Sequence, residues 1–106
     1  AGLSDLIDIR HGDALEVLLD IKNESNSSES FDFVFIDADK ERYIQYFDVI
    51  LPMVKPGGLI GADNILFPER FQKFTNLYVK HVRNNPKIRS VTIPIDNGEE
   101  LSLKLP

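Results

Sequence analysis

Acidic and amide side chains follow two apolar runs of the sequence, at the points where each run ends. Asp37 comes directly after the run 31–36, and Asp63 and Asn64 follow the run 59–62. If the two runs are neighbouring parallel strands, these side chains meet at the carboxyl edge of the sheet, where open α/β sheets bind ligands. Two carboxylates and an amide oxygen form a hard oxygen set that suits Mg²⁺. A second interpretation stays open, because Asp and Asn are also ordinary turn-forming and capping residues.

Lys40 is the candidate for proton transfer. It closes the stretch DADK, in which Asp37 is the first residue. A lysine beside a metal and a substrate hydroxyl can act as a general base. The alternative is that Lys40 is a solvated residue in the first turn of a helix.

The pattern of apolar residues predicts the elements that position these side chains. In chain order we expect a strand 6–10, a helix that begins at Asp13, a polar loop 23–30, a strand 31–36 that is buried on both faces, a helix over 43–51, a strand 59–62, a helix over 67–82 and a hairpin of 88–95 with 100–105. Alternating strands and helices are typical of a parallel sheet with right-handed crossovers. The sequence therefore predicts an α/β fold with a mainly parallel sheet, helices on both faces and a C-terminal antiparallel hairpin, in a single domain over 1–106.

The composition is that of a soluble globular protein and argues against several functions. The 106 residues are 42% hydrophobic and 27% charged, with a formal net charge of −5 and no cysteine. Nucleic-acid binding would need a basic face, and a membrane span would need about 20 consecutive apolar residues. The absence of cysteine excludes disulfides and thiolate metal sites. We expect a cytoplasmic protein that acts on a small molecule and binds neither nucleic acid nor a membrane.

The stretch FDFVFIDADKERYIQYFDVILPMVKPGGLIGADNILF closely resembles the cation-dependent O-methyltransferases of the caffeoyl-CoA and catechol type, which use S-adenosylmethionine (SAM). The upstream IDIRHGDALEVL and the closing IPIDNGEELSLKL are similar to the same family, so the resemblance covers nearly the whole chain. It implies a partial Rossmann-like class I methyltransferase fold. It also implies methyl transfer from SAM to a hydroxyl of a catechol-like substrate, assisted by a divalent cation such as Mg²⁺.

The resemblance implies roles for four residues at the two predicted strand ends. Asp37, Asp63 and Asn64 match the family's three protein ligands for the divalent cation. Lys40 matches the lysine near the substrate hydroxyl, which is the expected general base. The cation would hold two adjacent substrate oxygens and lower the pKa of the one that attacks the methyl group.

The resemblance also implies a cofactor site. Asp39 matches the acidic residue that faces the methionine portion of SAM, and Asp37 lies beside it. Asp13 and Ala14 lie where the family's loop after its third strand touches the adenine. We therefore expect these four residues to contact SAM.

The chain departs from the family pattern in two places. The family's Gly-rich SAM loop and its ribose-binding acid are not in this sequence, so the chain resembles a C-terminal half, and we expect the isolated fragment to be inactive. Only ILFPER separates Asn64 from the next predicted helix, where the family usually has a longer substrate loop. Without the preceding strands, the strand 31–36 has an open apolar edge, which is prone to association. We expect the chain either to form a homodimer through this edge or to pair strand 6–10 with it.

Two alternative functions remain open. The stretch FIDAD also resembles haloacid-dehalogenase-type phosphotransferases, in which Asp37 would be the nucleophile and Asp39 the acid/base. The other alternative is a non-catalytic association module that only dimerises or docks to a missing half.

Overall fold

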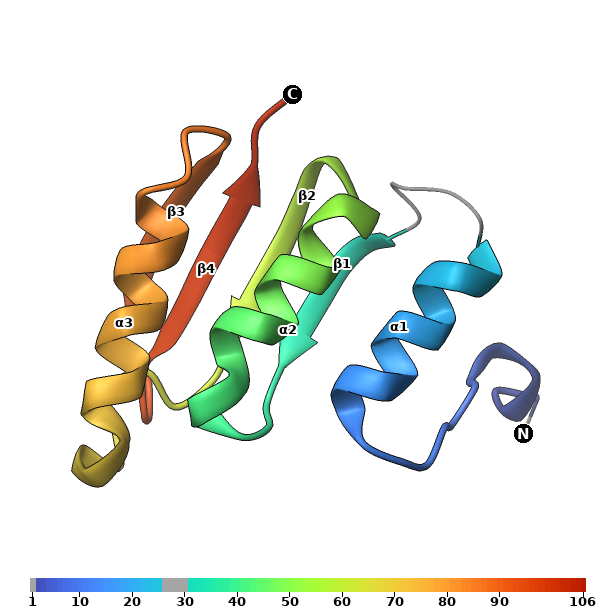
Figure 1. Ribbon diagram of the computed structural model, residues 1–106, viewed down its shortest axis with the longest axis horizontal. Coiled ribbons are helices and arrows are strands. Elements are labelled where there is room, and N and C mark those ends of the chain that lie inside the picture. The colour runs from blue at the N-terminus through green and yellow to red at the C-terminus, as the bar shows by residue number, and fades with distance from the viewer. Residues whose placement is uncertain (1, 26–30) are drawn as a thin grey trace.

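The computed structural model describes residues 2–25 and 31–106, which form an α/β fold around a four-stranded sheet (Figure 1). In chain order the helices and strands are α1 (Ala14–Ser25), β1 (Phe31–Ile36), α2 (Tyr43–Ile50), β2 (Val54–Ala62), α3 (Gln72–Arg83), β3 (Ile88–Ile93) and β4 (Glu99–Lys104). Short 3₁₀ turns cover Ser4–Leu6, Lys40–Arg42, Leu51–Met53 and Glu69–Phe71. Within these described residues, none of the helices combines the length and the apolarity that a bilayer crossing needs.

The sheet is mixed, with the strand order β1-β2-β4-β3. Strands β1 and β2 pair in parallel, and β4 runs antiparallel to both of its neighbours, β2 and β3. The predicted α/β class and the C-terminal antiparallel hairpin are confirmed. Because Ile36 pairs with Ala62, the carboxyl ends of β1 and β2 coincide at one edge of the sheet. The amide of Asp63 donates to the carbonyl of Ile36 at 3.0 Å, which holds the two strand ends together.

The hydrophobic core lies between the sheet and the helices α2 and α3. Its largest fully buried side chains include Tyr43 and Phe47 of α2, Ile60 of β2 and Tyr78 of α3. The ring of Tyr78 packs edge-on, 5.5 Å from the Tyr43 ring and 5.9 Å from the Phe47 ring, measured between centroids. Apolar residues four apart on α3, Tyr78 and Val82, lie on the same face of the helix and are both buried, as the helical spacing predicts.

The opposite face of the sheet has no helical cover among the described residues. Phe33, Phe35 and Val91 point to this face and are 51%, 55% and 54% exposed. The prediction that β1 is buried on both faces is therefore wrong, and so is the expected second layer of helices. The reason is that α2 and α3 lie on the same side of the sheet, while α1 contacts α2 beyond the β1 edge (Figure 1).

The prediction of a strand at 6–10 is also wrong. The chain makes a 3₁₀ turn over Ser4–Leu6 and then runs without regular structure to α1, with Leu6 and Ile9 79% and 76% exposed. A strand needs a ladder partner for its backbone groups, and among the described strands β1 pairs only with β2. The expected pairing of 6–10 with 31–36 is not formed, whereas the homodimer stays a prediction. The loop predicted at 23–30 begins later, because α1 continues to Ser25, and its remainder lies outside the described residues.

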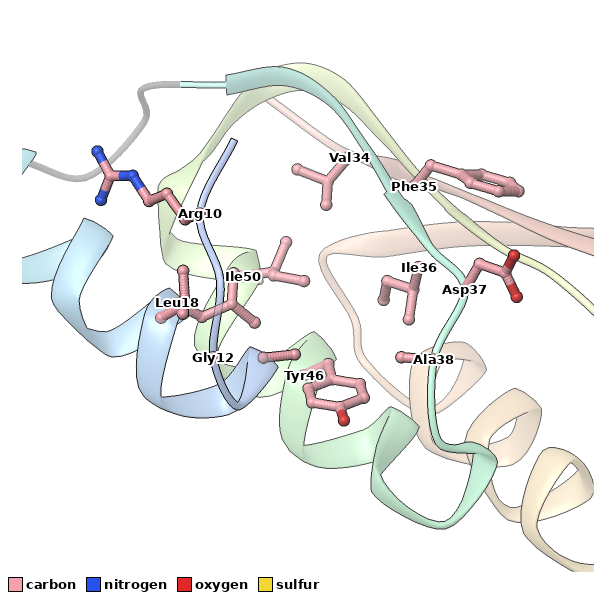
Figure 2. A pocket seen from close by; sticks show the side chains of 12 residues that line it. Arg10, Gly12, Leu18, Val34, Phe35, Ile36, Asp37, Ala38, Tyr46 and Ile50 are labelled. Atoms are coloured by element: carbon pink, nitrogen blue, oxygen red, sulfur yellow. The ribbon is translucent and has the colours of Figure 1, made fainter. Parts of the chain in front are cut away.

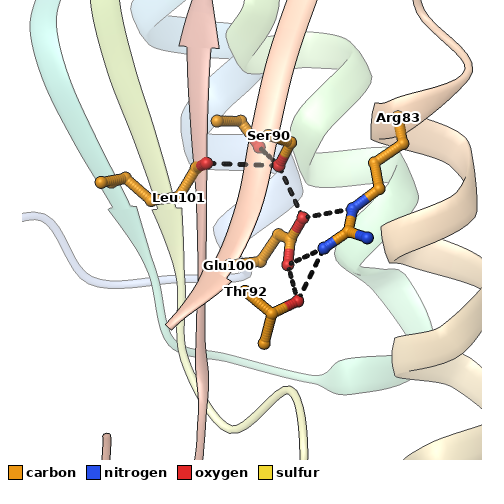
Figure 3. A network of polar contacts seen from close by, with 6 residues as sticks. Arg83, Ser90, Thr92, Glu100 and Leu101 are labelled. Atoms are coloured by element: carbon orange, nitrogen blue, oxygen red, sulfur yellow. Dashed lines mark hydrogen bonds and ion pairs between the residues drawn. The ribbon is translucent and has the colours of Figure 1, made fainter. Parts of the chain in front are cut away.

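A buried carboxylate connects α3 to the hairpin (Figure 3). Glu100 of β4 is fully buried, and Arg83 of α3 reaches its Oε2 with Nε at 3.0 Å. The hydroxyl of Ser90 donates to the same oxygen at 2.6 Å, and the hydroxyl of Thr92 donates to Oε1. Buried charge is tolerated where it is paired and hydrogen-bonded, so this network accounts for an acidic residue inside the sheet.

Candidate functional site

The structure places the three predicted cation ligands at one edge of the sheet. Asp37 follows β1, and Asp63 with Asn64 follows the neighbouring parallel strand β2. Asn64 adopts a left-handed backbone conformation, with φ of 57°, and its backbone N–H donates to Oδ1 of the Asp63 carboxylate at 2.8 Å. The side-chain oxygen of Asn64 accepts a hydrogen bond from Asn97 Nδ2 at 3.1 Å. No three acidic or histidine side chains within 2–25 and 31–106 are grouped so that they could hold a metal by themselves.

Lys40 is buried at the same edge. It begins the 3₁₀ turn Lys40–Arg42 and is only 9% exposed, so the interpretation of Lys40 as a solvated residue is wrong. Its Nζ donates to the carbonyl of Ala38 at 3.1 Å and to the hydroxyl of Tyr43 at 2.7 Å, and it lies 3.6 Å from Asp37 Oδ1. The hydroxyl of Tyr43 donates in turn to the carbonyl of Asp63 at 3.0 Å. Burial raises the pKa of Tyr43, so this hydroxyl keeps its proton near neutral pH.

Asp13 is positioned by its role at the start of α1. Its Oδ2 accepts a hydrogen bond from the amide of Glu16 at 3.2 Å, which confirms the predicted helix cap. Its Oδ1 lies 2.6 Å from Nη1 of Arg42, at the start of α2. The hydrogen bond from Arg42, followed by the one from the Glu16 amide, lowers the pKa of the Asp13 carboxyl. Asp13 is therefore ionised and joins the first turns of two helices.

A cavity of about 330 Å³ lies between α1 and β1 (Figure 2). Its lining is mostly apolar and includes Ala14, Leu18, Val34, Ile50 and the ring of Tyr46. Asp37 stands at one end of it (Figure 2). Of the four residues expected to contact SAM, Ala14 and Asp37 line this cavity, whereas Asp13 and Asp39 are not among its lining residues.

A second cavity, of about 580 Å³, lies on the other side of the loop that follows β1. It is lined by Ala38, Asp39, Lys40, Glu41, Asn64, Pro68, Arg70 and Phe71. Ala38 lines both cavities, so the stretch 37–40 separates an apolar compartment from one with more polar groups. Lys40 and Asn64 share the second compartment, which is where an acceptor hydroxyl could meet both.

Three residues of this region were not singled out in the sequence: Tyr43, Asn97 and Glu99. Glu99 begins β4, next to Glu100, which pairs with Ala62, and the Oε2 atom of Glu99 is buried without a hydrogen-bond partner. Burial, and then the contact with Asp63 and the charges of neighbouring acids, raises the pKa of Glu99 to about 7. The turn Asn97-Gly98 was visible in the sequence, but its position beside Asn64 depends on the pairing of β4 with β2.

The hairpin turn also fixes the loop that carries Asn64. The amide of Ile65 donates to the carbonyl of Gly98 at 3.0 Å, and the amide of Leu66 donates to the carbonyl of Asn97 at 2.9 Å. Gly98 has a φ of +86°, and a Cβ at this residue would lie 2.6 Å from Leu66 Cγ. The close approach of the two loops therefore requires glycine at this position.

Residues 1–105 match the O-methyltransferase family, so the chain belongs to this family. It is 35% identical over 120 residues to caffeoyl-CoA O-methyltransferase 1 of Eucalyptus globulus, an alignment that covers 99% of this chain and 48% of the relative. It is 52% identical over 67 residues to caffeoyl-CoA O-methyltransferase 1 of Zea mays, covering 63% of this chain and 26% of the relative. The family membership leaves no support for the phosphotransferase interpretation.

Solved structures show the same fold. The O-methyltransferase from Bacillus cereus in complex with SAH is 25% identical, with a TM-score of 0.78 over 92% of this chain and 50% of that chain. The O-methyltransferase TomG from Streptomyces achromogenes in complex with SAM is 21% identical, with a TM-score of 0.83 over 99% of this chain and 52% of that chain. The chain thus spans about half the length of the Eucalyptus relative and of these two solved chains. The Eucalyptus alignment, at 120 positions, is longer than this 106-residue chain, so that relative contains residues that this chain lacks.

Proposed function

We propose that this chain supplies the cation-binding and acceptor-binding part of an O-methyltransferase that transfers a methyl group from SAM to a hydroxyl of a catechol-like small molecule. The observation that carries the proposal is the burial of Lys40 at the sheet edge, where its Nζ lies 3.6 Å from Asp37 Oδ1 and where it lines the second cavity together with Asn64. The acceptor would occupy the second cavity. SAM would occupy the first cavity, with Ala14 and Asp37 in its lining and with Asp13 and Asp39 nearby in the chain.

The donor set at the sheet edge fits a divalent cation of the Mg²⁺ type. Asp37, Asp63 and Asn64 offer carboxylate and amide oxygens, which are hard ligands, and the chain has no cysteine that would favour a softer metal. When bound, the cation would polarise an acceptor hydroxyl and hold two adjacent oxygens of the acceptor. Both ligand-bearing loops follow strands of one sheet, so their separation is set by the β1–β2 ladder.

Lys40 would take the proton of the acceptor hydroxyl. Its Nζ donates two hydrogen bonds, to the carbonyl of Ala38 and to the hydroxyl of Tyr43. A neutral amine has two N–H groups and one lone pair, so both bonds can form while the lone pair stays available as a base. The acceptor oxygen then forms its bond to the methyl carbon as the bond from that carbon to the SAM sulfur breaks. The proton stays on Lys40.

The test uses binding and methyl transfer with a matched lysine control. Calorimetric titration with S-adenosylhomocysteine, with and without Mg²⁺, asks whether this chain holds the cofactor product by itself. Methyl transfer to a catechol is then compared for Lys40→Met and Lys55→Met, the second an exposed lysine on β2 that pairs with Asp32 at 3.3 Å. Loss of a positioned base should cost about a hundredfold or more in rate. If Lys40→Met and Lys55→Met had equal effects, Lys40 would not be the base.

The exposed sheet face favours a second role, association. Phe33 and Phe35 on β1 are more than half exposed, and β1 is one of the two edge strands of the described sheet. Exposed apolar strand edges promote pairing with another chain. We propose that the isolated chain forms a homodimer at this edge, and that methyl transfer by the isolated chain is weak. Sedimentation equilibrium of the chain and of Phe35→Lys would test this, since the substitution should shift the population to monomer.

A further inference from the structure

The hairpin brings an additional carboxylate to the proposed cation site. Strands β2 and β4 pair antiparallel with Ala62 opposite Glu100, so the next pair in this register is Asp63 with Glu99. Opposed residues of an antiparallel pair place their side chains on the same face of the sheet, so this register puts the Glu99 side chain beside that of Asp63. Glu99 comes from the far end of the chain and is not part of the set formed by the two parallel strand ends.

The charges around this pair are unbalanced. Asp37 and Asp96 also act on Glu99 electrostatically. Among the ion pairs of the described residues none includes Asp63 or Glu99, and Lys40 at the same sheet edge pairs with Asp37. Two adjacent carboxylates repel each other unless a proton or a cation lies between them. The buried Oε2 of Glu99, which has no hydrogen-bond partner, is a free ligand atom at this point.

The turn of the same hairpin also orients the side-chain amide of Asn64. Asn97 Nδ2 donates to Asn64 Oδ1 at 3.1 Å, which orients the side chain. A carbonyl oxygen has two lone pairs, so the second one remains available for a cation. Residues that orient metal ligands in this way affect metal affinity without touching the metal.

We propose that Glu99 joins Asp63 and Asn64 in binding the divalent cation, so that the β3–β4 hairpin forms one wall of the site. This rests on the proposed function for the presence of a cation at the sheet edge, and it adds a carboxylate that neither strand end supplies. The cation would be a hard divalent ion, held by oxygen atoms from two loops that are already hydrogen-bonded to each other.

The test is Mn²⁺ binding to the 106-residue chain, followed by electron paramagnetic resonance of the free ion. Glu99→Gln keeps the size of the side chain and removes its charge, and Glu99→Asp keeps the charge. Asp96→Asn is the matched control, because it removes one negative charge from the same turn at a left-handed residue that asparagine tolerates. We expect Glu99→Gln to weaken Mn²⁺ binding about tenfold or more, Glu99→Asp less, and Asp96→Asn by about threefold at most.

A second measurement locates the ion. Terbium emission excited through tyrosine should appear, because the Tyr43 hydroxyl lies 3.0 Å from the carbonyl of Asp63. The proposal is overturned if Glu99→Gln binds Mn²⁺ as the unaltered chain does, or if the unaltered chain binds no Mn²⁺ at millimolar concentration. Mn²⁺ binding that a catechol does not strengthen would count against the proposed function, in which the cation holds the acceptor oxygens, and would leave the role of Glu99 standing.

Discussion

The Nζ atom of Lys40 and the hydroxyl of Tyr43 are 2.7 Å apart, and that hydroxyl in turn donates to the carbonyl of Asp63 at the end of the neighbouring strand. This contact sets where Lys40 stands relative to both strand ends. Tyr43 lies on α2, so a helix of the core positions the proposed base.

Tyr43→Phe keeps the ring in the core and removes only the hydroxyl. Lys40 then loses one acceptor and the Asp63 carbonyl loses its donor, so we expect the free energy of unfolding to fall by about 1–3 kcal/mol. Urea denaturation measures this. Tyr46→Phe is the control on the same helix, because it also removes one tyrosine hydroxyl, from a ring whose centroid lies 5.6 Å from Cζ of Arg42 and not from the Lys40 contact. Equal losses for the two variants would show that the Lys40 contact contributes nothing specific.

Arg83→Ala should destabilise the chain more than truncation of other surface arginines. It leaves the carboxylate of Glu100 buried without its cation, while Ser90 and Thr92 remain as donors. We expect a loss of about 2 kcal/mol, below the usual cost of breaking a buried ion pair because the Arg83 side chain is 45% exposed. Arg89→Ala, an exposed arginine on β3, is the control for urea denaturation. Adding Glu100→Gln to Arg83→Ala should recover part of the loss, and no recovery would argue against the charge as its cause.

Asp13 should stabilise the fold in a pH-dependent way. The Arg42 hydrogen bond lowers its pKa in the folded chain below the ordinary value of 3.8. The stabilisation is therefore complete above that ordinary value and is lost as the pH falls through the lower folded pKa. We expect the difference in urea midpoint between the unaltered chain and Asp13→Ala to be largest near neutral pH and to shrink in acid. A difference that is constant from pH 7 to strong acid would contradict the ion pair with Arg42.

Gly98→Ala and Gly57→Ala separate backbone strain from a side-chain clash. Both glycines have a positive φ, +86° and +87°, but a Cβ at Gly57 meets nothing within 4 Å, whereas one at Gly98 meets Leu66 at 2.6 Å. Gly57→Ala should cost about 1 kcal/mol for strain alone, and Gly98→Ala about 1–3 kcal/mol more for the clash. Urea denaturation measures both free energies of unfolding. If the two variants were equally stable, the hairpin and the Asn64 loop would separate at little cost.

Local patterns predicted most elements of the fold. The helical spacing of Tyr78 and Val82 and the cap at Asp13 depend on neighbours in sequence, and both are confirmed. The apolar run at 6–10 has the same local appearance as a strand, but strand formation depends on a partner that the described residues do not offer. The exposure of Phe33 has the same origin, because an apolar side chain is buried only where another layer covers it.

The sequence predicted the part of the candidate site that follows β1 and β2. It did not predict the part that the β3–β4 hairpin contributes. The sequence predicted that Asp37 and Asn64 lie at one edge, because the two apolar runs before them were expected to be neighbouring parallel strands, as they are. Glu99 and Asn97 approach that edge because β4 lies between β2 and β3, an order that the chain sequence of strands does not reveal. The buried position of Lys40 is likewise linked to its hydrogen bond with Tyr43. Both residues are in the stretch DADKERY, but the sequence does not show that their side chains meet.

The interior position of β4 also has a consequence for biosynthesis. Of the four strands, β4 is the last to be made, yet it pairs with β2 and β3 and is the only connection between them in the sheet. Chains grow from the N-terminus, and domains fold as their residues emerge. One edge of β2 therefore stays unpaired until β4 leaves the ribosome. Only then can Asn97 donate its hydrogen bond to Asn64 and Glu99 take its place in the register opposite Asp63. A nascent chain that stops before β4 contains the loops with Asp37 and Asp63 but lacks Glu99 and the β3–β4 hairpin that packs beside them.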